Sequence, residues 1–233
     1  MDYVTYESYY IKDEELHILL AGSGKRSWYG LAQTEPHDQI KNLEDIHTIL
    51  AGLYQKEYIS FEKDKVVILE PMYSMIQILL YAKVCINARS DRNPMRCHYI
   101  YKDQVLFVER SQREQNMLRM TMLCCKEWLD LLFQESYFPE NLWERAGEIP
   151  SYGGVLESEK TLLECCMESG FYSGFEKVDC NFAKVTERLF VKEQDFVYTL
   201  YLQKQNLSIC REGSCWREIL QQWMNQEECH DFS

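Results

Sequence analysis

The residues best able to bind a metal or take part in catalysis are the ten cysteines and five histidines of this 233-residue chain. No two histidines have a spacing typical of metal ligands; they are His17, His37, His47, His98 and His230. Cys97 and His98 are neighbours in a predicted strand, so their side chains point to opposite faces and do not form a nucleophile–base pair. The chain also lacks the motifs Gly-x-Ser-x-Gly, His-Glu-x-x-His and Gly-x-Gly-x-x-Gly. We therefore predict that the protein is not an enzyme, and we assign no catalytic residues.

The cysteines do not form a metal-binding pattern either. Cys124-Cys125 and Cys165-Cys166 are adjacent pairs in predicted helices, where neighbouring side chains point about 100° apart and are poor ligands for one ion. The nearest approach to a metal-ligand spacing is Cys210 and Cys215, with Cys229-His230 further on, and no second close pair accompanies them. We expect reduced cysteines that pack as small apolar residues, with neither a metal nor a cofactor.

Composition and charge narrow the range of partners. The hydrophobic fraction of 46% is enough for a substantial core, and the formal charge of −12 disfavours binding to nucleic acid or to an anionic membrane. No run of about 18 apolar residues predicts a transmembrane helix. Residues 1–8 have neither the basic nor the apolar region of a signal peptide. We expect a cytoplasmic protein that binds neither nucleic acid nor a membrane.

The first third of the chain predicts two helices, a hairpin and a third helix. The second helix begins after Asn42, the hairpin strands cover 58–61 and 66–69, and Pro71 opens a helix expected to continue to about Asn87. This order is similar to that of a winged helix, which reads DNA through a basic helix and wing. Here acidic residues outnumber basic ones on both elements. A structural or protein-docking role is therefore favoured, and a winged-helix transcriptional regulator is an alternative.

Two later parts of the chain share one order of elements, which indicates a diverged internal duplication. The first, residues 95–135, predicts three strands and an amphipathic helix. The second begins near Val178 and predicts four strands before its helix, at 181–185, 188–192, 196–202 and 207–210. Leu106-Phe-Val-Glu-Arg110 is echoed by Leu189-Phe-Val-Lys-Glu193, and Lys126-Glu-Trp-Leu129 by Arg217-Glu-Ile-Leu220. Short helices are predicted between the two parts, at 139–146 and 158–170.

We therefore predict a single α+β domain over residues 1–233, with antiparallel sheet built from two pseudo-repeated strand–helix blocks. Its sub-parts are expected to be a winged-helix-like segment (1–92), a first block (93–150) and a second block (151–233). Alternation along strands such as 117–122 suits a sheet that helices cover on one side. The other face, with tyrosine, methionine and arginine side chains, would then be open to a partner.

This order of elements resembles the EspG-like chaperones of type VII secretion systems over residues 43–224. The resemblance rests on the helix–hairpin–helix segment containing Val66-Val-Ile-Leu-Glu-Pro71 and on the blocks that end Glu127-Trp128-Leu129 and Trp216-Arg-Glu-Ile219. It implies a cytosolic protein of mixed helices and strands with internal pseudo-twofold character. Such a protein binds the helical tip of secreted effectors or of their partner subunits and keeps them soluble until export.

The same resemblance implies a partner-binding loop between two strands of the first block. The matching residues in this sequence are Arg110, Gln112, Arg113, Gln115 and Asn116. We expect a non-enzymatic chaperone or adaptor for a helical protein. The alternatives are the winged-helix regulator and an immunity-type protein that neutralises a cognate toxin.

Overall fold

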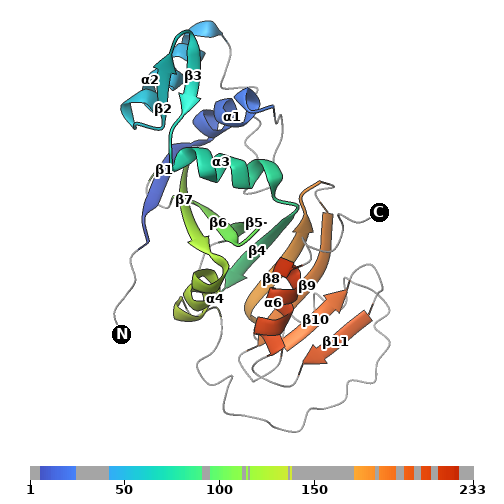
Figure 1. Cartoon of the computed structure of the whole chain (residues 1–233). Helices are drawn as coiled ribbons and strands as arrows, with labels where there is room; N and C mark the ends of the chain where they lie inside the picture. Colours follow the sequence, from blue (N-terminus) through green and yellow to red (C-terminus); the bar gives the residue numbers. More distant parts are fainter. Residues whose placement is uncertain are drawn as a thin grey trace.

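A long antiparallel sheet lies at the centre of the computed structural model, with helices on both of its faces (Figure 1). The structure describes residues 6–24, 42–90, 95–111, 114, 116–135, 137, 171–181, 184–192, 197–201, 206–210 and 215–225. The helices in these ranges are α1 (Asp13–Gly22), α2 (Leu43–Gln55), α3 (Met72–Tyr81), α4 (Cys125–Gln134) and α6 (Cys215–Asn225). The α+β fold class and the large antiparallel sheet are confirmed, whereas the predicted helices at 139–146 and 158–170 lie outside the described residues.

Nine of the described strands form one sheet in the order β1-β7-β6-β5-β4-β8-β9-β10-β11, with every neighbouring pair antiparallel. The strands of this sheet are β1 (Ser8–Lys12), β4 (Val84–Ser90), β5 (Arg96–Tyr101), β6 (Gln104–Arg110), β7 (Met117–Cys124), β8 (Phe171–Asp179), β9 (Lys184–Lys192), β10 (Val197–Tyr201) and β11 (Asn206–Cys210). Because β1 pairs with β7, the start of the described chain forms one edge of the sheet.

The predicted hairpin before α3 is present as a separate two-stranded sheet, β2 (Ile59–Glu62) and β3 (Lys65–Ile68). Its two-residue turn has positive φ at both Lys63 (43°) and Asp64 (66°). Paired positive φ angles are typical of a type I′ turn, whose twist matches that of the flanking strands. The preceding helix α2 also begins as predicted, since Asn42 accepts a hydrogen bond from the backbone N–H of Asp45 at 2.9 Å.

The prediction that the helix opened by Pro71 continues to Asn87 is wrong. Helix α3 ends at Tyr81, and its C-cap Ala82 already has a ψ of 122°, outside the helical range. Residues Val84–Ser90 are β4, which lies between β5 and β8. Residues 85–88 are buried on both faces, so their pattern has no period that separates helix from strand. Pairing with the two neighbouring strands therefore decides that this segment is a strand.

The strand assignment in the second half of the chain also needs correction. The predicted strands 181–185 and 188–192 are one strand, β9, and the sequence analysis missed β8 before it. Consequently the order of four strands followed by a helix occurs twice, as β4 to β7 with α4 and as β8 to β11 with α6. The echoed segments 106–110 and 189–193 lie on the third strand of one run and at the second strand of the other, so they are not at equivalent places.

Helices α4 and α6, by contrast, occupy equivalent places, and their buried residues correspond. Trp128, Leu129 and Leu132 of α4 are buried against the sheet. When Lys126-Glu-Trp-Leu129 is aligned with Arg217-Glu-Ile-Leu220, these three positions fall on buried residues of α6, namely Ile219, Leu220 and Trp223. Both helices therefore present the same part of their surface to the core.

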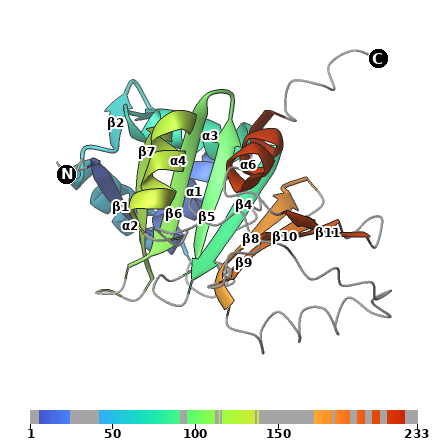
Figure 2. The ribbon, with the colours of Figure 1, turned by 90° about the horizontal axis from the view of Figure 1, so that it is seen from below.

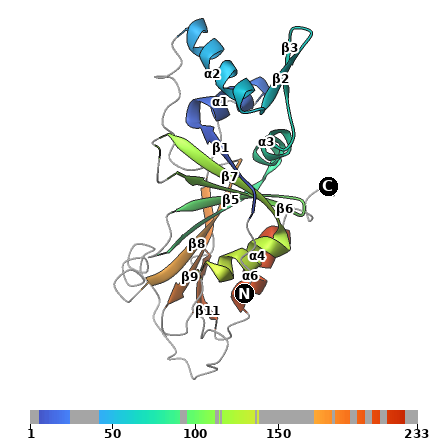
Figure 3. The ribbon, with the colours of Figure 1, turned by 90° about the vertical axis from the view of Figure 1, so that its left-hand side faces the viewer.

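The expectation of a sheet covered on one side is wrong for the described strands. Figure 3 shows α1, α2 and α3 on one side of the sheet and α4 and α6 on the other, and Figure 2 shows α4 and α6 over the same face. Alternate residues of β4 and β5 enter two separate cores because successive side chains point to opposite faces. Cys85 and Tyr99 lie in the core beneath α1 and α3, and Ile86 and Ile100 lie in the core beneath α4 and α6.

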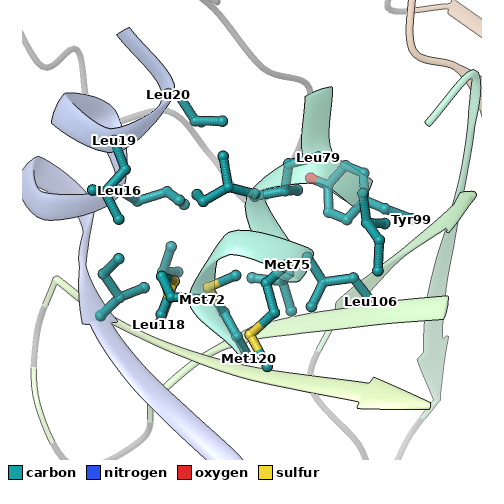
Figure 4. Packing of buried hydrophobic residues seen from close by; sticks show 14 of the residues in the cluster. Leu16, Leu19, Leu20, Met72, Met75, Leu79, Tyr99, Leu106, Leu118 and Met120 are labelled. Carbon is teal, nitrogen blue, oxygen red and sulfur yellow. The ribbon is translucent and has the colours of Figure 1, made fainter. Parts of the chain in front are cut away.

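The core beneath α1 and α3 is formed by side chains from distant parts of the chain (Figure 4). Leu16 of α1, Met75 of α3 and Met120 of β7 are fully or almost fully buried in it. Flexible methionine side chains fill irregular space between helices and sheet. This packing ties the N-terminal helices to the sheet.

Truncation of a buried residue of α4 is expected to lower the stability of the protein far more than truncation of an exposed residue of the same helix. Trp128→Ala removes a fully buried ring of α4, which should lower the free energy of unfolding by about 3–5 kcal/mol. Lys126→Ala, on the exposed side of α4, should change it by less than about 0.5 kcal/mol. Urea denaturation of both variants measures the difference. Similar losses in the two variants would contradict the orientation of α4.

Candidate functional site

The predicted partner-binding loop lies between β6 and β7, beside the start of α1. The Arg110 Nη1 atom is 3.0 Å from Asp13 Oδ2, and the backbone N–H of Asp13 donates to the carbonyl oxygen of Asn116 at 3.0 Å. Asn116 has a φ of 65°, in the left-handed region that asparagine tolerates better than most residues. Arg110 and Asn116 therefore fasten the ends of β6 and β7 to α1. Gln112, Arg113 and Gln115 lie outside the described residues.

An ionic cluster around the buried residues Arg96 and Glu109, which the sequence analysis missed, crosses three neighbouring strands. Glu109 of β6 lies opposite Arg96 of β5 and opposite Arg119 of β7 in the strand registers. Its carboxylate oxygens are 2.6 Å from Arg96 Nε and 3.0 Å from Arg119 Nε. Arg96 also forms an ion pair with Glu135, just after α4. Two arginines thus face two carboxylates, and the charges of the cluster balance.

Aromatic rings complete the surroundings of Arg96. Its guanidinium lies 4.9 Å from the centre of the Phe107 ring and 5.8 Å from that of Tyr137, distances at which a cation is attracted to an aromatic face. Burial raises the pKa of Tyr137 to about 12, so its hydroxyl is uncharged at neutral pH. The backbone carbonyl of Tyr137 accepts a hydrogen bond from the Ser173 hydroxyl of β8. Arg96 therefore links the segment after α4 to the sheet, which is a structural role.

A second polar pair lies beneath α6. Lys177 of β8 and Glu187 of β9 are opposite each other in the register, with Nζ and Oε1 3.0 Å apart. The other carboxylate oxygen of Glu187 accepts a hydrogen bond from the indole N–H of Trp223 at 2.8 Å. Burial of a charge is tolerated when it is paired and hydrogen-bonded, and both conditions hold here.

His98 is the buried histidine of the central sheet, and its surroundings keep it neutral. Burial lowers the pKa of His98 to about 3, and the positive charge of Arg96 acts in the same direction. Its Nδ1 lies 3.0 Å from the carbonyl oxygen of Ile86, and its ring packs against Phe107 and Trp128. A catalytic base works best with a pKa near the working pH, so His98 is poorly suited to proton transfer.

Cys85, Cys97, Cys124, Cys125 and Cys180 are free thiols. The thiols of Cys85 and Cys97 both donate to the side-chain oxygen of Asn87, at 3.6 and 3.2 Å. Burial raises the pKa of the Cys85 thiol well above its ordinary value, which disfavours the reactive thiolate. Within the described ranges, no group of three or more histidine, cysteine, aspartate or glutamate residues could hold a metal ion.

Exposed apolar side chains gather on α2 and the β2–β3 hairpin, which project from the sheet in Figure 3. Tyr54 and Phe61 are 55% and 56% exposed, and their ring centres are 5.6 Å apart. Val66 lies opposite Phe61 in the hairpin and is 45% exposed. These side chains are accessible to an apolar ligand, whereas Arg96, Glu109 and His98 are buried.

Comparison with known proteins assigns no family to the chain. No protein-family model matches the sequence, and no curated protein matches it. None of the helices in the described ranges combines the length and the apolar character needed to span a membrane.

The histidine at position 98 is expected to make stability depend on pH. Between pH 6.5 and about 3 the unfolded chain binds a proton at this residue and the folded protein does not, so acid favours unfolding. His98→Phe should therefore reduce the slope of unfolding free energy against pH by up to about 1.4 kcal/mol per pH unit in that window. Urea denaturation from pH 4 to pH 7 measures both slopes. Equal slopes in the two proteins would show that folding does not lower the pKa of His98.

The stability of the folded protein should depend on the balance of charges in the ionic cluster around Arg96. Arg96→Met leaves Glu109 buried with one of its two cations, so we expect a loss of about 3 kcal/mol in the free energy of unfolding. The double variant Arg96→Met/Glu109→Leu also removes the carboxylate of Glu109. Its free energy of unfolding should therefore fall by less than that of the single variant Arg96→Met. Lys126→Met, on the exposed side of α4, is the control. A double variant as unstable as the sum of its two single variants would contradict the coupling.

Proposed function

We propose that this protein is a non-enzymatic cytosolic chaperone or adaptor that binds a helical protein, and that it belongs with the EspG-like chaperones of type VII secretion systems. Its partner would be a secreted effector or the helical subunit of one. The role is to cover the apolar surface of that partner until export. The proposal involves no cofactor, nucleic acid or membrane.

The observation that carries this proposal is the order of strands in the central sheet. Strands β4 and β8 pair antiparallel, and each is the first of four consecutive strands that a helix follows in the described chain. Strand β1 adds one further strand beyond β7. We propose that the two runs are equivalent units that meet through their antiparallel first strands, which would place a twofold axis at that pair. The matching buried positions of α4 and α6 are further support for an internal duplication. Internal pseudo-twofold character is what the resemblance to this chaperone family implies.

The chemistry of the described residues also favours binding over catalysis. The charges of Arg96 and Lys177 are matched by carboxylates, and His98 is a neutral, buried residue. Exposed apolar side chains, in contrast, are present on α2 and on the hairpin. An enzyme needs reactive groups that a substrate can reach, whereas an adaptor needs accessible apolar surface.

The segment of residues 1–92 is proposed to be winged-helix-like and to contact another protein. Helix α2 followed by β2 and β3 has the helix-then-wing order. Residues 42–70 contain six carboxylates and three lysines, and a surface of that charge repels DNA. Contact with protein therefore suits this segment better than the regulatory alternative.

Co-expression tests the proposed function. The full chain would be produced together with small helical proteins encoded beside its gene, and each of these would also be produced alone. We expect one of them to be insoluble alone and to purify as a soluble complex with this chain, with a helical circular dichroism spectrum. If every such protein is soluble alone and none forms a complex, the chaperone function is excluded. A complex that suppresses the toxicity of its partner to the host cell would instead favour the immunity-type alternative.

A further inference from the structure

An apolar patch, which we call the hairpin patch, extends along α2 and onto the β2–β3 hairpin. It consists of Leu43, Tyr54, Phe61 and Val66, and Leu43 is the most exposed of them at 69%. The ring contact of Tyr54 with Phe61 and the cross-strand pairing of Phe61 with Val66 make the last three continuous.

The hairpin patch is the outward continuation of a buried core. Ile59 and Ile68 lie on the same face of the hairpin as Phe61 and Val66, because residues two apart in a strand share a face. Ile59 is buried and Ile68 packs partly against the core beneath α1 and α3. The apolar face of the hairpin thus begins in the core and ends in solvent.

Helix α2 shows the same gradual exposure along one stripe. Leu43, Leu50 and Tyr54 are seven and four residues apart, which places them within about 40° of one another around the helix. Leu50 packs partly against the core, while Leu43 and Tyr54 are exposed. The stripe from Leu43 to Tyr54 is about 16 Å long, which matches about three turns of a second helix lying beside it.

The surroundings of the hairpin patch are acidic. Residues 42–70 carry a formal charge of −3, from six carboxylates and three lysines. The Nζ atom of Lys56 forms an ion pair with Glu15 of α1 at 2.6 Å, so its charge is already matched. Lys63 and Lys65 lie at the hairpin turn, beside Glu62 and Asp64. A ligand with basic residues around an apolar centre is therefore complementary to this surface.

We propose that the hairpin patch binds an amphipathic helix of the partner protein, with an apolar stripe flanked by lysine or arginine residues. The inference rests on the proposed function, since the adaptor's partner is a helical protein, and adds which surface binds it and the charge that the partner carries. Docking of an apolar helix face against exposed apolar side chains is a common mode of peptide recognition. The aromatic residues Tyr54 and Phe61 would be the main anchors.

Labelled helical peptides of about five turns test the proposal. One peptide carries leucine on one face and lysine on the other, and the second carries glutamate in place of every lysine. Fluorescence anisotropy with the full chain measures both affinities. We expect the lysine peptide to bind at least about tenfold more tightly than the glutamate peptide. Failure of the lysine peptide to bind, or preference for the glutamate peptide, would overturn the proposal.

Substitutions in the patch show whether binding occurs there. Phe61→Ser and Val66→Thr should each weaken binding of the lysine peptide, the former by about tenfold. Val66→Thr keeps a β-branched side chain in the strand, so it preserves the fold even if Phe61→Ser does not. Tyr73→Ser removes an exposed aromatic ring of α3 outside the patch and should leave the affinity unchanged. Equal affinities in wild type and Val66→Thr, with both proteins folded by circular dichroism, would overturn the assignment of the site.

Two further outcomes separate the alternatives. A co-expressed helical partner that binds Val66→Thr and folded Phe61→Ser as tightly as wild type would overturn the patch as its site and leave the adaptor function intact. Analytical ultracentrifugation of the protein alone tests whether the patch binds a second copy of this chain. A dimer in wild type that becomes a monomer in Val66→Thr would show that the patch binds another copy of this chain, against the proposal.

Discussion

The antiparallel pairing of β4 with β8 is the interaction on which the rest of the structure depends. It runs from Val84 opposite Asp179 to Ser90 opposite Ser173, and it joins strands that are far apart in the sequence. Both cores use this pair: Cys85 and Val178 lie beneath α1 and α3, and Ile86 and Phe175 lie beneath α4 and α6. Without it, the two runs of strands would not form one sheet, and neither α4 nor α6 would have its complete core.

The buried charged groups of this sheet have partners on neighbouring strands. The Arg96 cluster and the Lys177–Glu187 pair satisfy their charges across neighbouring strands, and His98 stays neutral. Unpaired buried charge is costly, so such matching favours one strand register over others. The hairpin patch is where apolar side chains reach the surface, in an acidic setting.

Much of the local structure was predictable because it depends on nearby residues. The Asn42 cap, the polar turn between the two hairpin strands and the helix that ends the second block depend on a few neighbouring residues, and all are present as expected. The strand β4 was not predictable in this way, since its residues 85–88 are buried on both faces and the strand closely follows an apolar helix. The strand β8 was hidden for a different reason: Ser173 and Gly174 interrupt its apolar pattern, and its neighbours β4 and β9 supply the pairing that makes it a strand.

The sequence by itself determined the α+β class, the acidic charge, and most helix and turn positions, because these follow from composition and local pattern. Only the tertiary structure decided the strand order, the coverage of both sheet faces and the ionic cluster at Arg96. Arg96, Glu109 and Arg119 come together only once β5, β6 and β7 adopt their register, and no local pattern marks them as partners. The same holds for the hairpin patch. Its residues are ordinary apolar residues in the sequence, and only packing shows that Leu53 and Ile59 are buried while Tyr54 and Phe61 face solvent.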